Sequence, residues 1–179
     1  MRKPLLFAAT AVVVLLVALL AYVMTRPDVF RVQRSTVIAA PAEKLYPLVN
    51  ELRAWAAWSP YEKRDPGMRR TFSGASSGKG AVYAWAGNKD VGAGRMEILE
   101  ATPSSRILIK LDFLEPFEGH NTAEFTFEPG GAAGTRVTWA MYGPNAYLTR
   151  VMGLIFDMDE MIGRDFATGL ANLKAVAEK

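Results

Sequence analysis

The sequence predicts an α+β fold in which a curved antiparallel sheet wraps around a long C-terminal helix, preceded by one transmembrane helix. Three patterns lead to this prediction: an uncharged apolar run near the N-terminus, consecutive segments with alternating apolar residues, and a final segment with apolar residues at three- and four-residue steps. A period of two is typical of strands that bury one face, and the longer period is typical of an amphipathic helix. Short turns between the alternating segments indicate antiparallel hairpins.

The N-terminal apolar run extends from Leu5 to Met24, twenty residues without a charge. A helix of that length spans about 30 Å, which matches the hydrocarbon thickness of a bilayer. A cleavable signal peptide is the alternative, but its apolar stretch is normally only about 7–15 residues long. We therefore predict a transmembrane anchor over residues 1–25, a short linker over residues 26–31, and one folded domain over residues 32–179.

The charges that flank the anchor do not by themselves fix its orientation. Arg2 and Lys3 favour a cytoplasmic N-terminus, whereas Arg26, Arg31 and Arg34 follow the run closely and oppose it. Long domains cross a membrane largely regardless of their charge. We expect a single-pass protein of the cell membrane with its domain on the extracytoplasmic side.

Composition excludes several classes of function. The chain has no cysteine, which rules out disulfides, thiolate metal ligands and a cysteine nucleophile. Its single histidine, His120, is expected on the surface, so neither a metal site nor a cofactor is predicted. Without Arg2 and Lys3, the 21 basic residues become 19 against 18 acidic ones, a net charge of +1. Without a basic stripe, nucleic-acid binding is not expected.

The domain is expected to begin with a strand over residues 32–39 and a helix that residues 40–43 (APAE) open. Pro41 occupies an early helical position, where a missing backbone N–H costs little. A second short helix is expected over residues 52–58. Six further strands follow, over residues 68–72, 81–86, 94–101, 105–114, 122–128 and 135–142.

The predicted closing helix extends from about residue 145 to residue 177. Its apolar stripe consists of Met158, Ile162, Phe166, Leu170, Leu173 and Val176. The helix contains three glycines, at Gly153, Gly163 and Gly169. Each lowers helix stability by roughly 1 kcal/mol relative to alanine, so we expect close packing or a bend at these positions. A strongly bent sheet cannot pack flush along a whole helix, and we therefore expect a cavity between them.

The inward-facing positions of the sheet and the helix are predicted to line this cavity. They are Tyr83, Trp85, Met96, Ile109, Leu111, Phe113, Asn121, Phe125, Trp139, Met141, Met158, Ile162 and Phe166. Methionine offers adaptable apolar surface, which suits a promiscuous pocket. Asn121 is an inward amide that must find hydrogen-bond partners in the protein, in water or in a ligand. For any single residue, ordinary core packing is the alternative.

Three further motifs are interpreted as structural. The glycine-rich segment 73–80 (SGASSGKG) lacks the spacing of a phosphate-binding loop, and we expect a flexible loop. Trp55, Trp58 and Tyr61 are expected to pack the second short helix onto the sheet, with a lid over the cavity as the alternative. The acidic residues between positions 157 and 160 are expected to form a solvated helix face.

Five segments carry a resemblance to a known superfamily. They are residues 40–46 (APAEKLY), 55–60 (WAAWSP), 92–96 (GAGRM), 134–139 (GTRVTW) and 169–174 (GLANLK). They resemble the START-like (SRPBCC) superfamily, and most closely its polyketide cyclase/dehydrase and lipid-transport branch. The resemblance covers residues 32 to the C-terminus and implies a helix-grip fold with a cavity for lipids, sterols, polyketides or quinones. It brings no shared catalytic motif, so no catalytic residue is assigned.

The leading functional hypothesis is a membrane-anchored binding protein that holds a lipid, an isoprenoid or a quinone-like molecule. One alternative is an enzyme resembling a polyketide cyclase or dehydratase, which would need an inward acid or base. A buried Asp or Glu facing the cavity would favour that alternative. Another is an accessory subunit of a larger membrane complex, docked through the anchor or through the apolar stretch 147–156.

Overall fold

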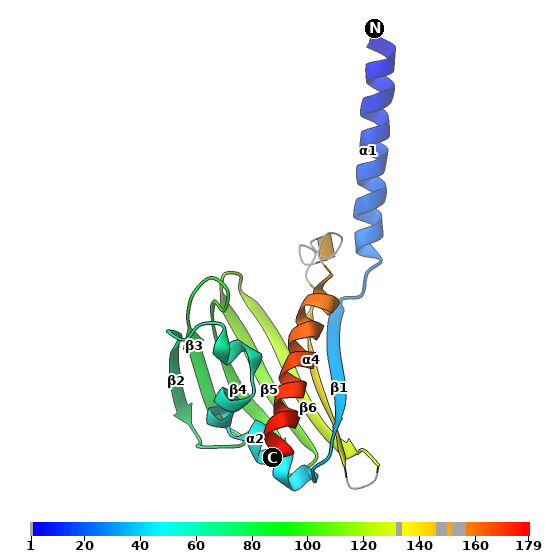
Figure 1. Cartoon of the computed structure of the whole chain (residues 1–179). Helices are drawn as coiled ribbons and strands as arrows, with labels where there is room; N and C mark the ends of the chain where they lie inside the picture. Colours follow the sequence, from blue (N-terminus) through cyan, green and yellow to red (C-terminus); the bar gives the residue numbers. More distant parts are fainter. Residues whose placement is uncertain (1, 132–133, 146–149, 152–156) are drawn as a thin grey trace. The chain divides into compact units, whose positions relative to one another are not determined.

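Figure 1 shows the computed structural model of the chain, which describes residues 2–131, 134–145, 150–151 and 157–179. The chain divides into two compact units. The N-terminal unit comprises Met1–Phe30 and Pro144–Asp157, and the sheet unit comprises Arg31–Gly143 and Met158–Lys179. The residues predicted to line a cavity all belong to the sheet unit.

Seven strands form one sheet in the order β1-β7-β6-β5-β4-β3-β2. The strands are β1 (Val29–Ile38), β2 (Arg69–Gly74), β3 (Ala81–Ala86), β4 (Ala93–Thr102), β5 (Arg106–Glu115), β6 (Gly119–Pro129) and β7 (Thr135–Pro144). All neighbouring pairs from β2 to β7 are antiparallel. The prediction of consecutive antiparallel hairpins is confirmed. The largest differences are at β1 and β6, which each begin three residues earlier than expected. The earlier start of β6 adds His120 and Asn121 to the strand.

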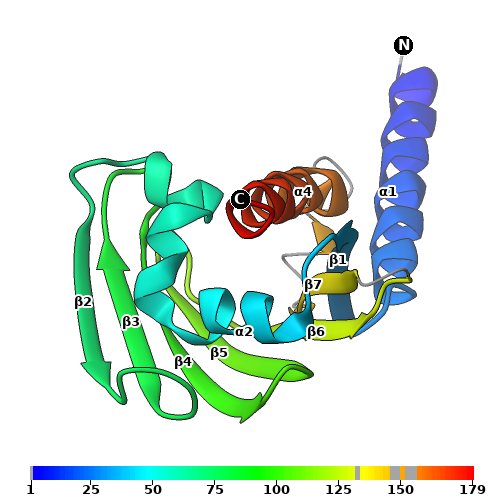
Figure 2. The same ribbon diagram turned by 60° about the horizontal axis from the view of Figure 1, so that its bottom comes forward.

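The sheet curves around helix α4 (Met158–Ala177), as Figure 2 shows in a view along that helix. Helix α2 (Ala42–Asn50) and the 3₁₀ helices η1 (Leu52–Ala57) and η2 (Pro60–Lys63) also lie on the inward side. Alternation along β5 decides which side chains face them: Ile107 and Ile109 have no exposed surface, whereas Lys110 is exposed. This arrangement confirms the predicted helix-grip sheet.

Two glycines allow α4 to approach the sheet closely. A Cβ atom added at Gly169 would lie 2.7 Å from Cζ3 of Trp139 and 3.1 Å from Cδ of Pro60. At Gly163 it would collide with the guanidinium of Arg34, which pairs with Asp159 at 2.9 Å. The Trp139 ring leaves no room for a side chain at Gly169, whereas the flexible end of Arg34 would have to move to admit one at Gly163. The prediction of close packing at these glycines is confirmed. Gly153 lies outside the described residues.

The prediction of one continuous helix from about residue 145 is wrong. Asn145 and Asp157 are not helical, and α4 begins only at Met158. Asp157 and Glu160 have the spacing of a capping box. In this motif an acidic residue three positions after the N-cap residue stabilises the start of a helix. Residues 146–149 and 152–156, which hold most of the apolar stretch 147–156, lie outside the described residues.

In the N-terminal unit, helix α1 extends over Arg2–Met24. Over the part of the chain that the structure describes, no helix is both long enough and apolar enough to cross a membrane. This finding does not support the predicted transmembrane anchor, which stays a prediction from the sequence.

The segment that follows α1 is held by Arg150. Its Nε donates to the carbonyl of Asn145 at 2.6 Å, its Nη1 donates to the carbonyl of Arg26 at 3.2 Å, and its Nη2 pairs with Asp28. Because β1 already begins at Val29, the connection to the sheet is shorter than the predicted linker of residues 26–31.

Candidate ligand-binding site

The residues predicted to line a cavity separate by exposure. A sealed group has at most 3% of its surface exposed: Tyr83, Ile109, Phe125, Trp139 and Phe166. Met96 and Met141 are also buried, at 7% and 6%. An open group is half-buried: Trp85, Leu111, Phe113, Asn121 and Ile162. Met158 is 39% exposed at the start of α4. Whether any of them contacts a ligand stays a prediction.

Stacked aromatic rings fill the space between the sheet and α4 around Trp139. Its ring stacks on Phe166 with centroids 4.1 Å apart and on Phe125 at 5.0 Å. Trp58, 5.6 Å from Trp139, has no exposed surface and donates its Nε1–H to the carbonyl of Leu48 at 2.8 Å. A side chain without exposed surface touches no space that a water could occupy, so this part of the inward face is packed core.

Trp55 and Tyr61 extend the same cluster. Trp55 is 5% exposed, lies 4.9 Å from Trp58, and donates to the carbonyl of Val49 at 2.9 Å. Tyr61 meets Trp139 edge-on at 6.4 Å. The interpretation of these residues as a corner that packs the short helices onto the sheet is confirmed.

The strand residues of the open group, Trp85, Leu111, Phe113 and Asn121, lie toward the end of the sheet at which β5 ends and β6 begins. The register pairs Leu111 with Asn121 across these two strands, and Phe113 with Gly94 across β5 and β4. The ring of Trp85 lies directly over Gly94, since a Cβ atom there would be 2.4 Å from the indole. The rings of Trp85 and Phe113 meet edge-on with their centroids 6.0 Å apart, and together they form a continuous aromatic wall.

Asn121 supplies the polar group of this region. Its side chain makes no hydrogen bond with any residue that the structure describes, although it is half-buried. Gly143 leaves room for it, because a Cβ atom there would lie 2.2 Å from Oδ1 of Asn121. An inward amide with free donors and an acceptor can bind the polar end of an otherwise apolar molecule.

A buried carboxylate, which the sequence did not reveal, lies on the same inward face. Oε1 of Glu62 accepts a hydrogen bond from the hydroxyl of Tyr83 at 2.6 Å, and Oε2 accepts one from Nε of Arg70 at 2.6 Å. The Glu62 side chain is only 8% exposed. Burial, together with the hydrogen bond and charge of Glu62, raises the pKa of Tyr83. The missed signal was Arg70, whose position on β2 faces inward and which therefore needs a carboxylate partner.

The other polar candidates are on the outward face or the surface. The His120 side chain is 63% exposed and lies 2.8 Å from Asp112 across the β5–β6 pair, as expected for a surface histidine. Burial opposes ionisation of Asp112, but hydrogen bonds from Lys110 and His120 outweigh it and lower the pKa of Asp112. Among the described residues, no group of three or more His, Asp or Glu side chains is suited to hold a metal ion.

Comparison with known proteins agrees with this architecture. A family model described as "Polyketide cyclase / dehydrase and lipid transport" matches residues 29–178, which is most of the chain. No curated protein matches the sequence.

Several solved structures share the fold. A protein of Chromobacterium violaceum is 19% identical with a TM-score of 0.58, covering 86% of this chain and 99% of that one. The di-domain ARO/CYC BexL from the BE-7585A biosynthetic pathway is 17% identical with a TM-score of 0.62, covering 89% of this chain and 53% of that one. DynU16, a putative protein in the dynemicin biosynthetic locus, is 19% identical with a TM-score of 0.58, covering 86% and 48%. Identities this low establish the fold alone.

Proposed function

Because the chain belongs to the polyketide cyclase/dehydrase and lipid transport family, we propose that it binds an apolar or amphipathic small molecule through its open group. The observation that carries this proposal is the contrast in exposure on one inward face. Leu111, Phe113 and Trp85 are half-buried although their positions on the sheet are inward, so apolar surface remains available there. Burying such surface yields roughly 25 cal/mol per Å², which favours an apolar ligand.

The unpartnered amide of Asn121 narrows the class of ligand. An apolar molecule with one hydrogen-bonding end, such as an isoprenoid alcohol, a quinone or a lipid, would satisfy the amide and cover the aromatic wall. A purely hydrocarbon ligand would leave the amide buried without a hydrogen-bond partner, which would cost about 1–3 kcal/mol of binding free energy.

Native mass spectrometry of the full-length protein, released gently from detergent, tests this proposal, together with lipid analysis of the same sample. We expect one apolar species bound at a defined stoichiometry. A Leu111→Trp variant should lower its occupancy at least tenfold, because the larger side chain fills the space beside Phe113. The matched control is Leu108→Trp, on the outward face of the same strand β5, and it should retain the ligand.

An empty wild-type protein would overturn the binding proposal. It would favour the accessory-subunit alternative, in which the domain docks to a larger membrane complex. Co-migration with a defined complex in mild detergent is the measurement for that alternative.

We also propose that α1 anchors the domain in the cell membrane, with the domain on the extracytoplasmic side. The support is the absence of any charged residue from Leu5 to Met24 in a helix that extends over Arg2–Met24. Replacing Val14 and Val17 by arginine should release the chain from alkaline-washed membranes, because each central arginine costs about 2.5–3.5 kcal/mol on insertion scales. An intact mass that lacks the N-terminal residues would identify a cleaved signal peptide instead.

The buried Glu62 favours a second candidate, an enzyme resembling a cyclase or dehydratase. Its carboxylate and the Tyr83 hydroxyl, 2.6 Å apart, form an acid–base pair on the inward face. Incubating the co-purified ligand with the protein should then yield a product lighter by one water. Glu62→Gln should stop this conversion while the ligand stays bound, and a ligand that is recovered unchanged would exclude the candidate.

A further inference from the structure

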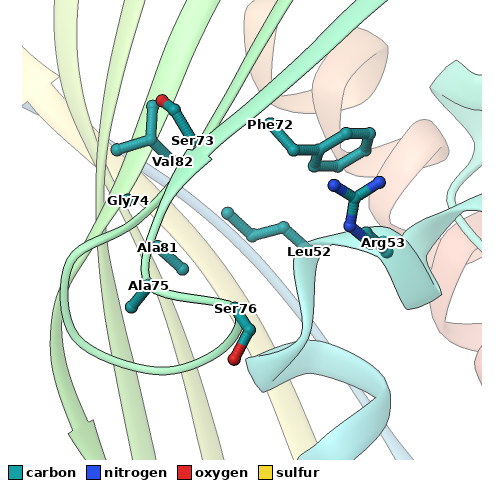
Figure 3. Close-up of a pocket in the computed structure, with 9 residues that line it drawn as sticks. All are labelled: Leu52, Arg53, Phe72, Ser73, Gly74, Ala75, Ser76, Ala81 and Val82. Carbon is teal, nitrogen blue, oxygen red and sulfur yellow. The ribbon is translucent and has the colours of Figure 1, made fainter.

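A pocket of about 230 Å³ lies at the edge of the sheet, between η1 and the loop that joins β2 to β3 (Figure 3). Its lining consists of Leu52, Arg53, Phe72, Ser73, Gly74, Ala75, Ser76, Ala81 and Val82. None of the residues predicted for the site between sheet and α4 takes part. The pocket is therefore a separate site, and the inference drawn from it does not rest on the function proposed above.

The glycine-rich segment 73–80 gives one side of this pocket a defined shape. Gly74 has φ +72°, and a Cβ atom there would lie 2.1 Å from the carbonyl oxygen of Gly80. The amide of Gly78 donates to the carbonyl of Asn50 at 3.1 Å, and the amide of Gly80 donates to Ile98 at 2.8 Å. Backbone hydrogen bonds thus tie the segment both to α2 and to β4, in contrast to the flexible loop expected from the sequence.

Arg53 brings a positive charge to the rim of the pocket. Its guanidinium carbon lies 4.2 Å from the centroid of the Phe72 ring, and that ring stacks on Tyr83 at 4.9 Å. Tyr83 is in turn fixed by its hydrogen bond to Glu62. A guanidinium placed on an aromatic face keeps its N–H donors free at its edge, so Arg53 is positioned without its hydrogen-bonding capacity being used.

The charge of Arg53 is not neutralised within the described part of the chain. Seven other arginines pair with carboxylates: Arg31, Arg34, Arg64, Arg70, Arg95, Arg106 and Arg150. Arg53 has no such pair among the residues that the structure describes, and it is exposed. An exposed guanidinium group without a carboxylate partner in the protein can bind the carboxylate of a ligand through two parallel hydrogen bonds.

We propose that this pocket binds a small organic monoanion of the carboxylate class. The carboxylate accepts hydrogen bonds from Arg53, and the rest of the molecule occupies the space between η1 and the loop that joins β2 to β3. A single unpaired cation balances one negative charge, which favours a carboxylate over a phosphate dianion. The volume lies below the roughly 300–1,000 Å³ of pockets for drug-sized ligands, so the ligand is small.

Figure 3 shows how the side chains serve this role. Leu52 extends from η1 toward the strand ends, and Arg53 lies beside the Phe72 ring on the same side of β2. The apolar and charged parts of the pocket are therefore adjacent, as an amphipathic anion requires. Ser76 lies on the loop at the opposite side from Arg53.

The test uses the full chain in detergent, titrated with 2-naphthoate and, separately, with its uncharged analogue 2-naphthamide. Binding is followed by calorimetry and by the backbone amide signals of the segment 73–80. We expect 2-naphthoate to bind at least tenfold more tightly than 2-naphthamide and to shift these signals. Arg53→Gln should lower the affinity for 2-naphthoate at least tenfold.

Arg69→Gln is the matched control, because Arg69 is an exposed arginine of β2 that does not line the pocket. This variant should bind 2-naphthoate within about twofold of the wild type. Equal affinities for the two probes, or an unchanged affinity in Arg53→Gln, would overturn the proposal. Shifts confined to Leu111 and Asn121 would also overturn it, since they would place the probe at the open group instead.

Discussion

The sealed group and the open group share one inward face and one apolar pattern, yet they differ in what covers them. At Trp139 the helix, η1 and η2 all supply aromatic partners, and the rings leave no exposed surface at Phe125. At Leu111 and Phe113, along the same sheet, the described residues leave part of each side chain exposed. Inward orientation therefore does not distinguish a core residue from a binding residue; coverage by other elements does.

The largest expected effect is a loss of free energy of unfolding, which should differ between Trp58 in the packed aromatic cluster and Trp85 in the open group. Trp58→Ala removes a side chain with no exposed surface and a hydrogen bond to Leu48, and should lower the free energy of unfolding by about 3–5 kcal/mol. Trp85→Ala, in the open group, should lower it by only about 1–2 kcal/mol, because part of that ring is exposed. Urea denaturation of the full chain in detergent measures both. Equal losses would mean that the open group is core as well.

A smaller effect is expected where α4 meets the sheet. Gly169→Ala places a methyl group 2.7 Å from the Trp139 ring and 3.1 Å from Pro60, and overpacking of this kind costs about 1–3 kcal/mol. Gly163→Ala serves as the comparison, because its contact is the mobile end of a side chain, the guanidinium of Arg34. That variant should cost less, since Arg34 can move away and alanine gains roughly 1 kcal/mol of helix propensity. A greater loss at Gly163 would contradict the packing argument.

The smallest effect concerns two tyrosines on the inward side. Burial raises the pKa of Tyr61, with a further contribution from the charge of Asp165, and burial with Glu62 raises that of Tyr83. Unfolded tyrosines ionise near pH 10, before the folded ones do, so the stability these groups contribute is complete below about pH 10 and is lost as the pH rises further. Urea midpoints measured from about pH 9 to about pH 11 should fall, and the Tyr61→Phe/Tyr83→Phe double variant should fall less steeply. An unchanged slope in the double variant would show that other groups cause the loss.

The elements whose prediction succeeded are those that depend on neighbours along the chain. Alternation identified β3 with its exact bounds, and the stripe through Phe166, Leu170 and Leu173 identified the buried face of α4. The prediction failed at Asp157, because a new helix begins at Met158 within the apolar periodicity. Periodicity reports a buried face, and a local capping signal decides where the helix begins.

The candidate sites depended on contacts between distant segments. Asn121 was found from the sequence because its parity on β6 could be counted. Glu62 could not be found in this way, because it lies on a 3₁₀ helix and becomes buried only when Tyr83 and Arg70 meet it. Arg53 likewise gains its position from Phe72 on another element.

The sequence by itself determined the fold class, the strand order along the chain and the face that each strand buries, because pleat and helix periodicity are local properties of the backbone. Only the tertiary structure decided which inward side chains are sealed, which stay open, and where a carboxylate and an unpaired arginine lie. Those outcomes depend on where α2, η1, η2 and α4 pack against the sheet. The contacts that fix these positions join residues far apart in the chain, such as Trp139 with Phe166 and Arg34 with Asp159.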